Sequence, residues 1–432
     1  MVAQQRYAEG GAGTNWAGNV RFGAGRVHRP ASVSELRRLV AGAGRLRALG
    51  TGHSFSPIAD SPGELVSVAG LPPAVTVDAG RRTATVAAGL RYGELVPRLH
   101  RAGYALPGLA SLPHISVAGA CATGTHGSGD RVGNLATAVA ALELVTAGGE
   151  LLRLDRAAGA DRFDGSVVGL GALGIVTSLT LDLVPAYQVV QYVYDDLPFD
   201  TLVQRWPEVF AAAYSVSVFT SWAGRCTGQV WLKRRLADPD AGVAPPQRWL
   251  GARLAGGARH PIPGASPDHC TEQLGAPGAW YARLPHFRLE FTPSSGQELQ
   301  SEYLLPRELT AEALAGLHRI RDRVAPVLQT CELRTIAADR LWLSPSYQRD
   351  TLAVHFTWIA DQPAVTAAVA AVEELLLPLA ARPHWGKLFQ AGPEVIRASY
   401  PRLADFTALI GQLDPAGKFR NEFLDRYFPV CR

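Results

Sequence analysis

The sequence has 432 residues, enough for two or three lobes with hydrophobic cores of their own. Hydrophobic residues make up 47% and charged residues 19% of the chain, a composition that excludes an intrinsically disordered protein. The formal net charge is only +4 and the basic residues are scattered, which argues against a nucleic-acid-binding protein.

Residues 1–185 predict a mixture of short strands and helices. Ser32 and Glu35 form a capping box in front of an apolar helical face, and a second amphipathic helix is expected over residues 92–102. Strands are expected at residues 45–49, 65–68, 75–78, 83–87, 140–146, 151–154 and 175–184. Because these elements do not alternate in a strict strand–helix–strand rhythm, the predicted class is α+β rather than a doubly wound sheet.

The pattern changes after Pro185. Alternating strands are expected at residues 216–222, 229–233, 287–291, 298–303, 331–336 and 351–359. Two helices interleave with them, near residues 310–324 and 364–377, so we expect a large antiparallel sheet with helices on one face. Residues 237–267 predict a surface excursion. The tail from Ala391 predicts a turn at residues 414–421 followed by an extended segment.

Cysteine usage and apolar patterning bear on location. The five cysteines are far apart and lack CxxC spacing, which indicates a reducing compartment and no zinc site. The first residues carry no apolar signal core, and no apolar run reaches about 18 residues, the best candidate being 364–380 with two glutamates and a proline. We therefore expect a cytoplasmic protein with no membrane segment.

Lysine is nearly absent from the chain. Only Lys233, Lys387 and Lys418 occur among 42 basic residues. A lysine can release its proton whereas an arginine cannot, so each retained lysine is a candidate for a special role. Position suggests a surface strand for Lys233 and a turn for Lys418.

A glycine motif at residues 169–174 matches G-x-G-x-x-G. A dinucleotide fingerprint requires a helix after the motif, because the helix N-terminus holds the pyrophosphate. Residues 175–184 are rich in β-branched side chains and predict a strand instead. The motif therefore predicts a close backbone approach to some cofactor rather than a Rossmann site.

Two segments of small residues each contain a histidine. The first is the loop around Gly50, Gly52 and His53, and the second is SLPHISVAGACATGTHGSG at residues 111–129. Small side chains let the main chain lie against a flat or phosphate-bearing ligand, and the alternatives are an ordinary loop histidine and a packing seam. Two such segments in one lobe favour a cofactor cradle.

The chain resembles FAD proteins of the vanillyl-alcohol-oxidase type in four segments. They are the two histidine-containing segments, GLGALGIVT at 169–177 and DPAGKFRN at 414–421. Within that superfamily, GQELQSEYLLPRE, CELRTIAADRLWLSPSY and HFTW in the second half are similar to the alditol (xylitol) oxidases, relatives of the aldonolactone oxidases. The resemblance implies a two-part FAD-binding domain at 1–185 and 391–432 around a substrate domain at 186–390.

The resemblance also implies a set of cofactor contacts. His53 matches the histidine bonded covalently to the flavin 8α-methyl, since neutral imidazole is nucleophilic. The other expected contacts are Gly50, Thr51, Gly52, Ser54, Ser111, Ser116, Gly119, Thr123, Gly124, Thr125, His126, Gly171, Gly174, Ile175, Phe419 and Asn421.

Strand alternation predicts a polar face in the second half. Glu332 and Arg334 share one face of their strand, His355 and Thr357 share one face of the next, and Gln300 lies with Glu298 and Glu302. The alternative is a solvated face with an ion pair. The resemblance implies that a polyol is held by Ser111, Gln300, Glu332, Arg334, Thr357 and Lys387.

Such a site combines acceptors and donors for a row of hydroxyl groups. The expected reaction is oxidation of a terminal CH₂OH, with catalytic roles for Lys387, His355 and Arg334. Either His355 or Lys387 is a candidate base, and Arg334 with Lys387 would stabilise developing negative charge. Molecular oxygen is the expected electron acceptor.

Several alternatives stay open at this stage. Ala110 matches a position where a methyl group can obstruct oxygen, so a dehydrogenase is the alternative to an oxidase. An aldonolactone oxidase or dehydrogenase and a non-catalytic flavin- or sugar-binding protein are the competing functions. We expect a monomer with no metal and no nucleic-acid partner.

Overall fold

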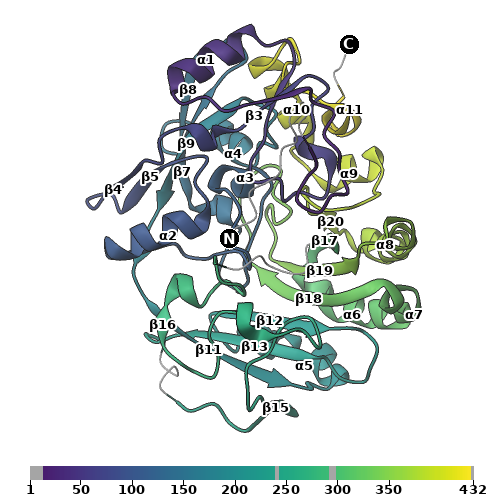
Figure 1. The fold of residues 1–432 in the computed structure, drawn as a ribbon. Coiled ribbons are helices and arrows are strands. Elements are labelled where there is room, and N and C mark those ends of the chain that lie inside the picture. Colours follow the sequence, from purple (N-terminus) through teal and green to yellow (C-terminus); the bar gives the residue numbers. More distant parts are fainter. Residues whose placement is uncertain (1–12, 239–242, 291–297, 430–432) are drawn as a thin grey trace.

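The computed structural model describes residues 13–238, 243–290 and 298–429. Two large antiparallel sheets dominate it: elements from the first 185 residues and the C-terminal tail lie together on one side, and the largest sheet lies on the other (Figure 1). The expected α+β class and large antiparallel sheet are confirmed. The domain bounds at residues 185 and 390 stay a prediction.

The first part contains a five-stranded antiparallel sheet and a three-stranded parallel one. The five strands, in spatial order, are β4 (Val75–Asp78), β5 (Thr83–Ala87), β9 (Ile175–Asp182), β7 (Val139–Val145) and β8 (Leu151–Asp155). The three parallel strands are β1 (Arg26–His28), β3 (Glu64–Val66) and β2 (Leu46–Ala48), and a two-stranded pair joins β6 (Tyr104–Ala105) to β10 (Val184–Pro185). The parallel sheet was not predicted, because three-residue strands carry little alternation.

The second part is built on a ten-stranded antiparallel sheet. In spatial order its strands are β14 (Arg248–Trp249), β15 (Ala252–Leu254), β11 (Gln188–Asp195), β13 (Gln229–Arg235), β12 (Ser215–Thr220), β18 (Leu328–Ile336), β19 (Thr351–Ile359), β17 (Glu298–Pro306) and β20 (Arg382–Pro383), with β16 (Gly278–Ala279) paired to β11.

Helices cover one face of this large sheet. They are α5 (Phe199–Ala211), α6 (Thr310–Arg319), α7 (Arg321–Val324) and α8 (Gln362–Leu376). Leu333, Val354 and Phe356 are fully buried and belong to the core between the sheet and these helices. The opposite face of β18 and β19, and of the neighbouring β17, is therefore left for polar residues.

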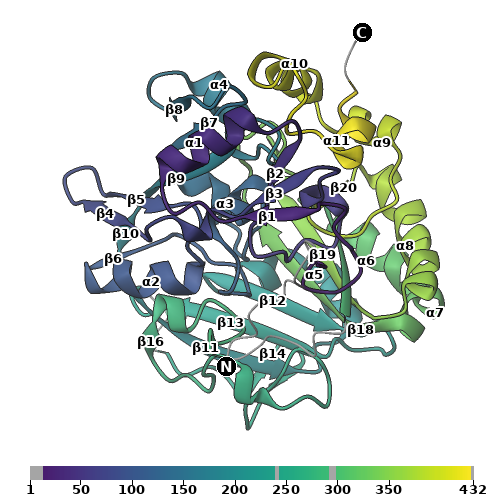
Figure 2. The same cartoon turned by 45° about the horizontal axis from the view of Figure 1, so that its top comes forward.

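The remaining helices belong to the first part and the tail. They are α1 (Val33–Gly42), α2 (Tyr92–Arg101), α3 (Val117–Ala122), α4 (Ala160–Val167), α9 (Pro393–Ser399), α10 (Leu403–Leu413) and α11 (Glu422–Tyr427), the last three lying beside the N-terminal elements in both views (Figures 1 and 2). Ser32 caps α1 as predicted, its Oγ accepting from Glu35 N at 3.1 Å.

Four details of the predicted elements are wrong. The tail after the turn is the helix α11 rather than an extended segment, because Asn421 caps it by accepting from Leu424 N. The helix expected at 310–324 is divided at Ile320. Phe287 forms only an isolated bridge to Cys270, and Phe291 lies outside the described residues. Lys233 is 1% exposed, not on the surface.

Residues 362–379 form a helical segment long and apolar enough to cross a membrane by length and composition alone. In this fold α8 packs Val365, Val369 and Val372 into the core against the large sheet. Its apolar character therefore has a structural explanation within the protein.

Candidate active site

A cavity of about 350 Å³ lies between the two parts of the molecule. One wall consists of the small-residue segments and the glycine motif of the first part. The other wall is the polar face of β17, β18 and β19. The cavity therefore joins the two groups of residues that the sequence singled out separately.

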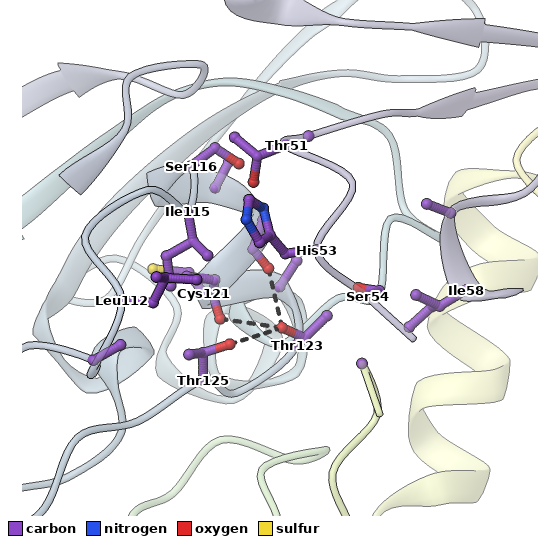
Figure 3. Close-up of a pocket in the computed structure, with 18 of the residues that line it drawn as sticks. Thr51, His53, Ser54, Ile58, Leu112, Ile115, Ser116, Cys121, Thr123 and Thr125 are labelled. Carbon is purple, nitrogen blue, oxygen red and sulfur yellow. Dashed lines mark hydrogen bonds between the residues drawn. The ribbon is translucent and has the colours of Figure 1, made fainter. Parts of the chain in front are cut away.

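His53 lies in the loop that follows β2, at the wall of the cavity (Figure 3). Its Nδ1 is buried and has no hydrogen-bond partner among the described residues. The pKa of His53 is lowered to about 4, chiefly because burial disfavours the charged ring and also because His114 is near. Trp16 stacks on the ring with centroids 5.4 Å apart. The imidazole is thus held neutral, although a hydrogen bond to the Thr51 backbone opposes the shift.

The segment from Ser116 to Thr125 forms the cradle beside His53. Ser116 is the N-cap residue of α3, and Thr123 Oγ1 donates to Gly119 O at 3.1 Å and lies 3.1 Å from Thr125 Oγ1 (Figure 3). A Cβ added at Gly50 would lie 2.8 Å from Ser116 Oγ, so the Ser116 side chain would have to turn away to accommodate it. The close approach explains why the predicted cradle is rich in small residues.

The glycine motif lines the same cavity through Gly171 and Gly174. It is followed by the strand β9, so the interpretation against a Rossmann site is confirmed. Arg47 is 2% exposed and donates to Leu170 O at 2.8 Å and to Phe419 O at 2.5 Å. This guanidinium ties the motif to β2 and to the tail.

Four of the predicted cofactor residues do not line the cavity: Gly124, Ile175, Phe419 and Asn421. Ile175 and Phe419 are fully buried in a small core of their own, and Asn421 Nδ2 donates to Asp60 O at 2.8 Å while its Oδ1 caps α11. Ile175, Phe419 and Asn421 therefore support the elements around the cavity without reaching into it. The other predicted cofactor residues all line it.

All seven residues expected around the substrate line the cavity: Gln300, Glu332, Arg334, His355 and Thr357 from the strands of the opposite wall, Lys387 from the loop after β20, and Ser111 from the first part. The register sets Glu302, His355 and Glu332 side by side on neighbouring strands, and Gln300, Thr357 and Thr330 in the next row. The predicted strand faces are confirmed. The roles given to these residues stay a prediction.

Glu302 is the centre of this wall, and the sequence prediction did not include it among the site residues. Its Oε2 lies 2.7 Å from Lys387 Nζ, and its Oε1 lies 2.6 Å from Arg334 Nη2 and 3.3 Å from His126 Nε2. Burial alone would raise the pKa of Glu302, but the charges of Lys387, His126 and Arg334 outweigh it and hold the pKa well below its usual value.

His355 and Lys387 lie in contact above Glu302. His355 Nδ1 lies 3.2 Å from both Arg334 Nη2 and Lys387 Nζ. Burial, reinforced by Lys387, holds the pKa of His355 well below its usual value, so the ring is neutral. Burial also lowers the pKa of Lys387, although Glu302 opposes the shift.

Ser111 joins the two walls, since Arg334 Nη1 donates to its Oγ at 3.3 Å. Sequence reasoning missed His286, whose Nε2 lies 2.8 Å from Glu332 Oε1, and His384, which lines the cavity beside Gly386. Neither residue stands in a strand with an alternating pattern. Glu302 could have been found, because it shares a strand face with Gln300.

Two family models match the chain. Residues 24–155 match an FAD binding domain, and residues 295–427 match D-arabinono-1,4-lactone oxidase. The chain is 53% identical to an alditol oxidase of a Streptomyces species over 95% of its own length and 97% of the relative's. It is 30% identical to an L-gulono-1,4-lactone dehydrogenase of Mycobacterium tuberculosis, over 96% and 98%.

Solved structures agree on the fold. A cholesterol oxidase from B. sterolicum superposes with a TM-score of 0.77 at 15% identity, covering 96% of each chain. At that identity the likeness concerns architecture alone, and it agrees with an FAD-binding lobe joined to a large antiparallel sheet.

Proposed function

Because this chain belongs to the family of FAD-dependent alditol oxidases, we propose that it oxidises the terminal primary hydroxyl of alditols such as xylitol and sorbitol to the aldose. Molecular oxygen is the proposed electron acceptor and hydrogen peroxide the second product. The observation that carries the proposal is the polar wall of β17, β18 and β19, which sets charged and hydroxyl side chains in rows facing the flavin-binding lobe.

The residues of the first wall fit FAD. Gly50 and Gly119 leave space against Ser116, and the buried Nδ1 of His53 has no hydrogen-bond partner among the described residues. FAD, when bound, accepts a hydride from a substrate carbon and transfers the electrons to oxygen. We propose that His53 forms the covalent link to the flavin, because a neutral imidazole with a pKa of about 4 is nucleophilic at physiological pH.

The substrate wall suits a chain of hydroxyl groups, each of which donates and accepts. Glu332 accepts, Arg334 donates, and Thr357, Gln300 and Ser111 do both. A site that pairs every hydroxyl rejects analogues that lack one, because buried polar groups are then left unpaired. The wall therefore supports selectivity for polyols over simple alcohols.

The hydrogen bonds favour Lys387 over His355 as the base. Arg334 can only donate, so His355 Nδ1 must accept from it, and the hydrogen of the neutral ring then lies on Nε2. His355 therefore cannot take a proton on Nδ1 without losing the bond from Arg334, and its Nε2 lies 3.3 Å from Lys387 Nζ. Lys387 has a lowered pKa. In its neutral form it takes the proton of the terminal hydroxyl while hydride leaves the carbon that bears this hydroxyl.

Oxidation of an aldonolactone is the second candidate. The match of residues 295–427 to D-arabinono-1,4-lactone oxidase and the likeness to a gulonolactone dehydrogenase favour it. Ala110 lies at the cavity wall, where its methyl group would bear on the access of oxygen. Initial rates of peroxide formation with xylitol, sorbitol and gulonolactone separate the two: polyol turnover should exceed lactone turnover, and the reverse would contradict the proposal.

We further propose that the enzyme is a monomer of the cytoplasm. The four described cysteines are free, and three of them are buried, a pattern that fits a reducing compartment. Fractionation of cells and light scattering of the purified protein test the two parts of this proposal.

A further inference from the structure

Two further residues form a buried chain with Glu332: His286, which also lines the cavity, and Lys233, which does not. Lys233 Nζ lies 3.0 Å from His286 Nδ1, and His286 Nε2 lies 2.8 Å from Glu332 Oε1. Lys233 is 1%, His286 4% and Glu332 5% exposed. Nothing in the polyol chemistry described above uses Lys233 or His286.

The direction of each hydrogen bond in this chain is fixed from both ends. Lys233 Nζ also donates to Leu284 O at 2.5 Å and to Pro285 O at 3.3 Å, so His286 Nδ1 is the third acceptor for an ammonium group with three hydrogens. Glu332 has its pKa held far below the usual value, since Arg334 and His286 outweigh the effect of burial, and so it can only accept. His286 must therefore carry its hydrogen on Nε2.

The surroundings hold His286 in this orientation. Phe219 and Trp231 pack against its ring in T-shaped pairs, with centroids 5.5 and 5.1 Å away, and its backbone N donates to Ser111 O at 3.0 Å. Burial, with Lys233 next, lowers the pKa of His286 to about 4, so the ring is neutral over most of the working range. A rotated ring would lose its bonds to both partners.

The two carboxylate oxygens of Glu332 therefore differ in their hydrogen bonds. Oε1 is engaged by His286 and lies 3.6 Å from Arg334 Nε. Oε2 has no hydrogen bond from the described residues, and His355 Nδ1 lies 3.8 Å from it. Glu332 lines the cavity, and its Oε2 is the oxygen left free to accept a hydrogen bond.

We propose that Lys233 and His286 are positioning residues, which fix Glu332 as a carboxylate whose Oε2 accepts a hydrogen bond from one substrate hydroxyl. The role rests on the proposed polyol function. It predicts discrimination: a substrate with a deoxy, keto or ether position there has no hydrogen to donate. It also explains why a lysine is kept at 233, since a planar guanidinium does not reproduce an ammonium with three acceptors around one nitrogen.

The first test reads the tautomer and needs no turnover. Burial lowers the pKa of Lys233 to about 7, with Glu332 opposing the shift and Cys270 and Arg334 also acting on it, so at pH 6 the lysine is an ammonium and His286 is neutral. Histidine-selective ¹⁵N NMR of the holoenzyme at pH 6, assigned with His286→Gln, should show the Nε2–H form. A hydrogen on Nδ1 in the wild-type protein overturns the proposal.

The second test measures discrimination in variants. Lys233→Met should raise the KM for xylitol about tenfold with kcat within about twofold, and should shrink the preference for xylitol over a deoxy analogue. His286→Gln keeps an amide N–H at the place of Nε2 and should keep most of that preference, whereas His286→Phe should lose it. Unchanged KM and preference in Lys233→Met overturn the proposal.

Lys418→Met is the matched control, because Lys418 is also a buried lysine, with Nζ donating to Val40 O and Ala147 O far from Glu332. It should lower stability without changing the ¹⁵N signature or the preference. If Lys233→Met does not fold, the ¹⁵N signature of the wild-type protein and the substrate preference of the two His286 variants still test the proposal. If the wild-type protein oxidises no polyol, the proposed function fails, while the tautomer measurement still decides the positioning of Glu332.

Discussion

Lys387 Nζ and Glu302 Oε2 lie 2.7 Å apart on the floor of the cavity, and both side chains are largely buried. Glu302 also binds Arg334, so one carboxylate orients two cations. The pKa of Lys387 is therefore the outcome of two opposing effects, burial that lowers it and Glu302 that raises it. This balance decides at which pH Lys387 becomes neutral.

Replacing Glu302 by Gln should move the activity profile. Without the carboxylate the pKa of Lys387 falls further, so the rising limb of kcat/KM against pH should shift to lower pH. The unfolding free energy should also fall by about 3 kcal/mol or more, because Arg334 loses a buried partner. Glu298→Gln, on the same strand face, is the matched control and should leave the limb in place. A limb unmoved in Glu302→Gln would exclude Lys387 as the titrating group.

Lys387→Arg keeps the positive charge but cannot release a proton at working pH. If Lys387 is the base, kcat should fall by about 10²–10⁴-fold. His355→Gln, whose amide N–H stands near the place of Nε2–H, should lose far less. Stopped-flow reduction of the flavin measures both variants. A larger loss in His355→Gln than in Lys387→Arg would assign the base to His355.

His53→Ala should release its flavin on denaturation. In the wild-type protein the yellow colour should survive acid precipitation and remain in the pellet, because the proposed link to His53 is covalent. The variant's pellet should be colourless, with the flavin in the supernatant. A coloured pellet from His53→Ala would show that another residue carries the link.

Acid should destabilise the protein before it affects most carboxyl groups. His286 and His384 have pKa values lowered to about 4 and 3 by burial, against about 6.5 in an unfolded chain. Between the folded and unfolded pKa values, these histidines bind protons in the unfolded chain but not in the folded protein. The unfolding free energy therefore falls as the pH drops below 6.5, and the two histidines do not change it above that pH.

The loss at pH 5.5 should be about 1 kcal/mol for each of these histidines, measured as the urea midpoint against pH. His384→Asn keeps an acceptor for Gly386 N, which now donates to His384 Nδ1 at 3.1 Å, and removes the titrating ring. Its midpoint should therefore fall less steeply between pH 6.5 and 4. An equal slope in both proteins would show that His384 does not titrate as described.

Strand alternation predicted the substrate wall well, because its three central strands are nine residues long and bury one face under helices. Glu302 was left out of the predicted site although its face was known, since alternation does not tell which polar residue forms the ion pairs. Lys233 was misplaced because a lysine in a strand is ordinarily exposed, whereas here its Nζ is held by the carbonyls of Leu284 and Pro285. Contacts of this kind join residues far apart in sequence.

Gly50 and Gly119, two of the predicted cofactor residues, line the cavity where a side chain would crowd Ser116. Phe419 and Asn421 do not line the cavity: Phe419 O accepts from Arg47, and Asn421 caps α11. A motif locates a segment, whereas the direction of each side chain follows from packing.

The central claim is that the two walls of the cavity hold a flavin against a polyol. An absorbance spectrum of the purified holoenzyme before and after anaerobic addition of xylitol tests it most directly. We predict that the oxidised flavin bands bleach with xylitol and return when air is admitted, with little bleaching by gulonolactone at equal concentration. A spectrum unchanged by xylitol but bleached by the lactone would contradict the claim.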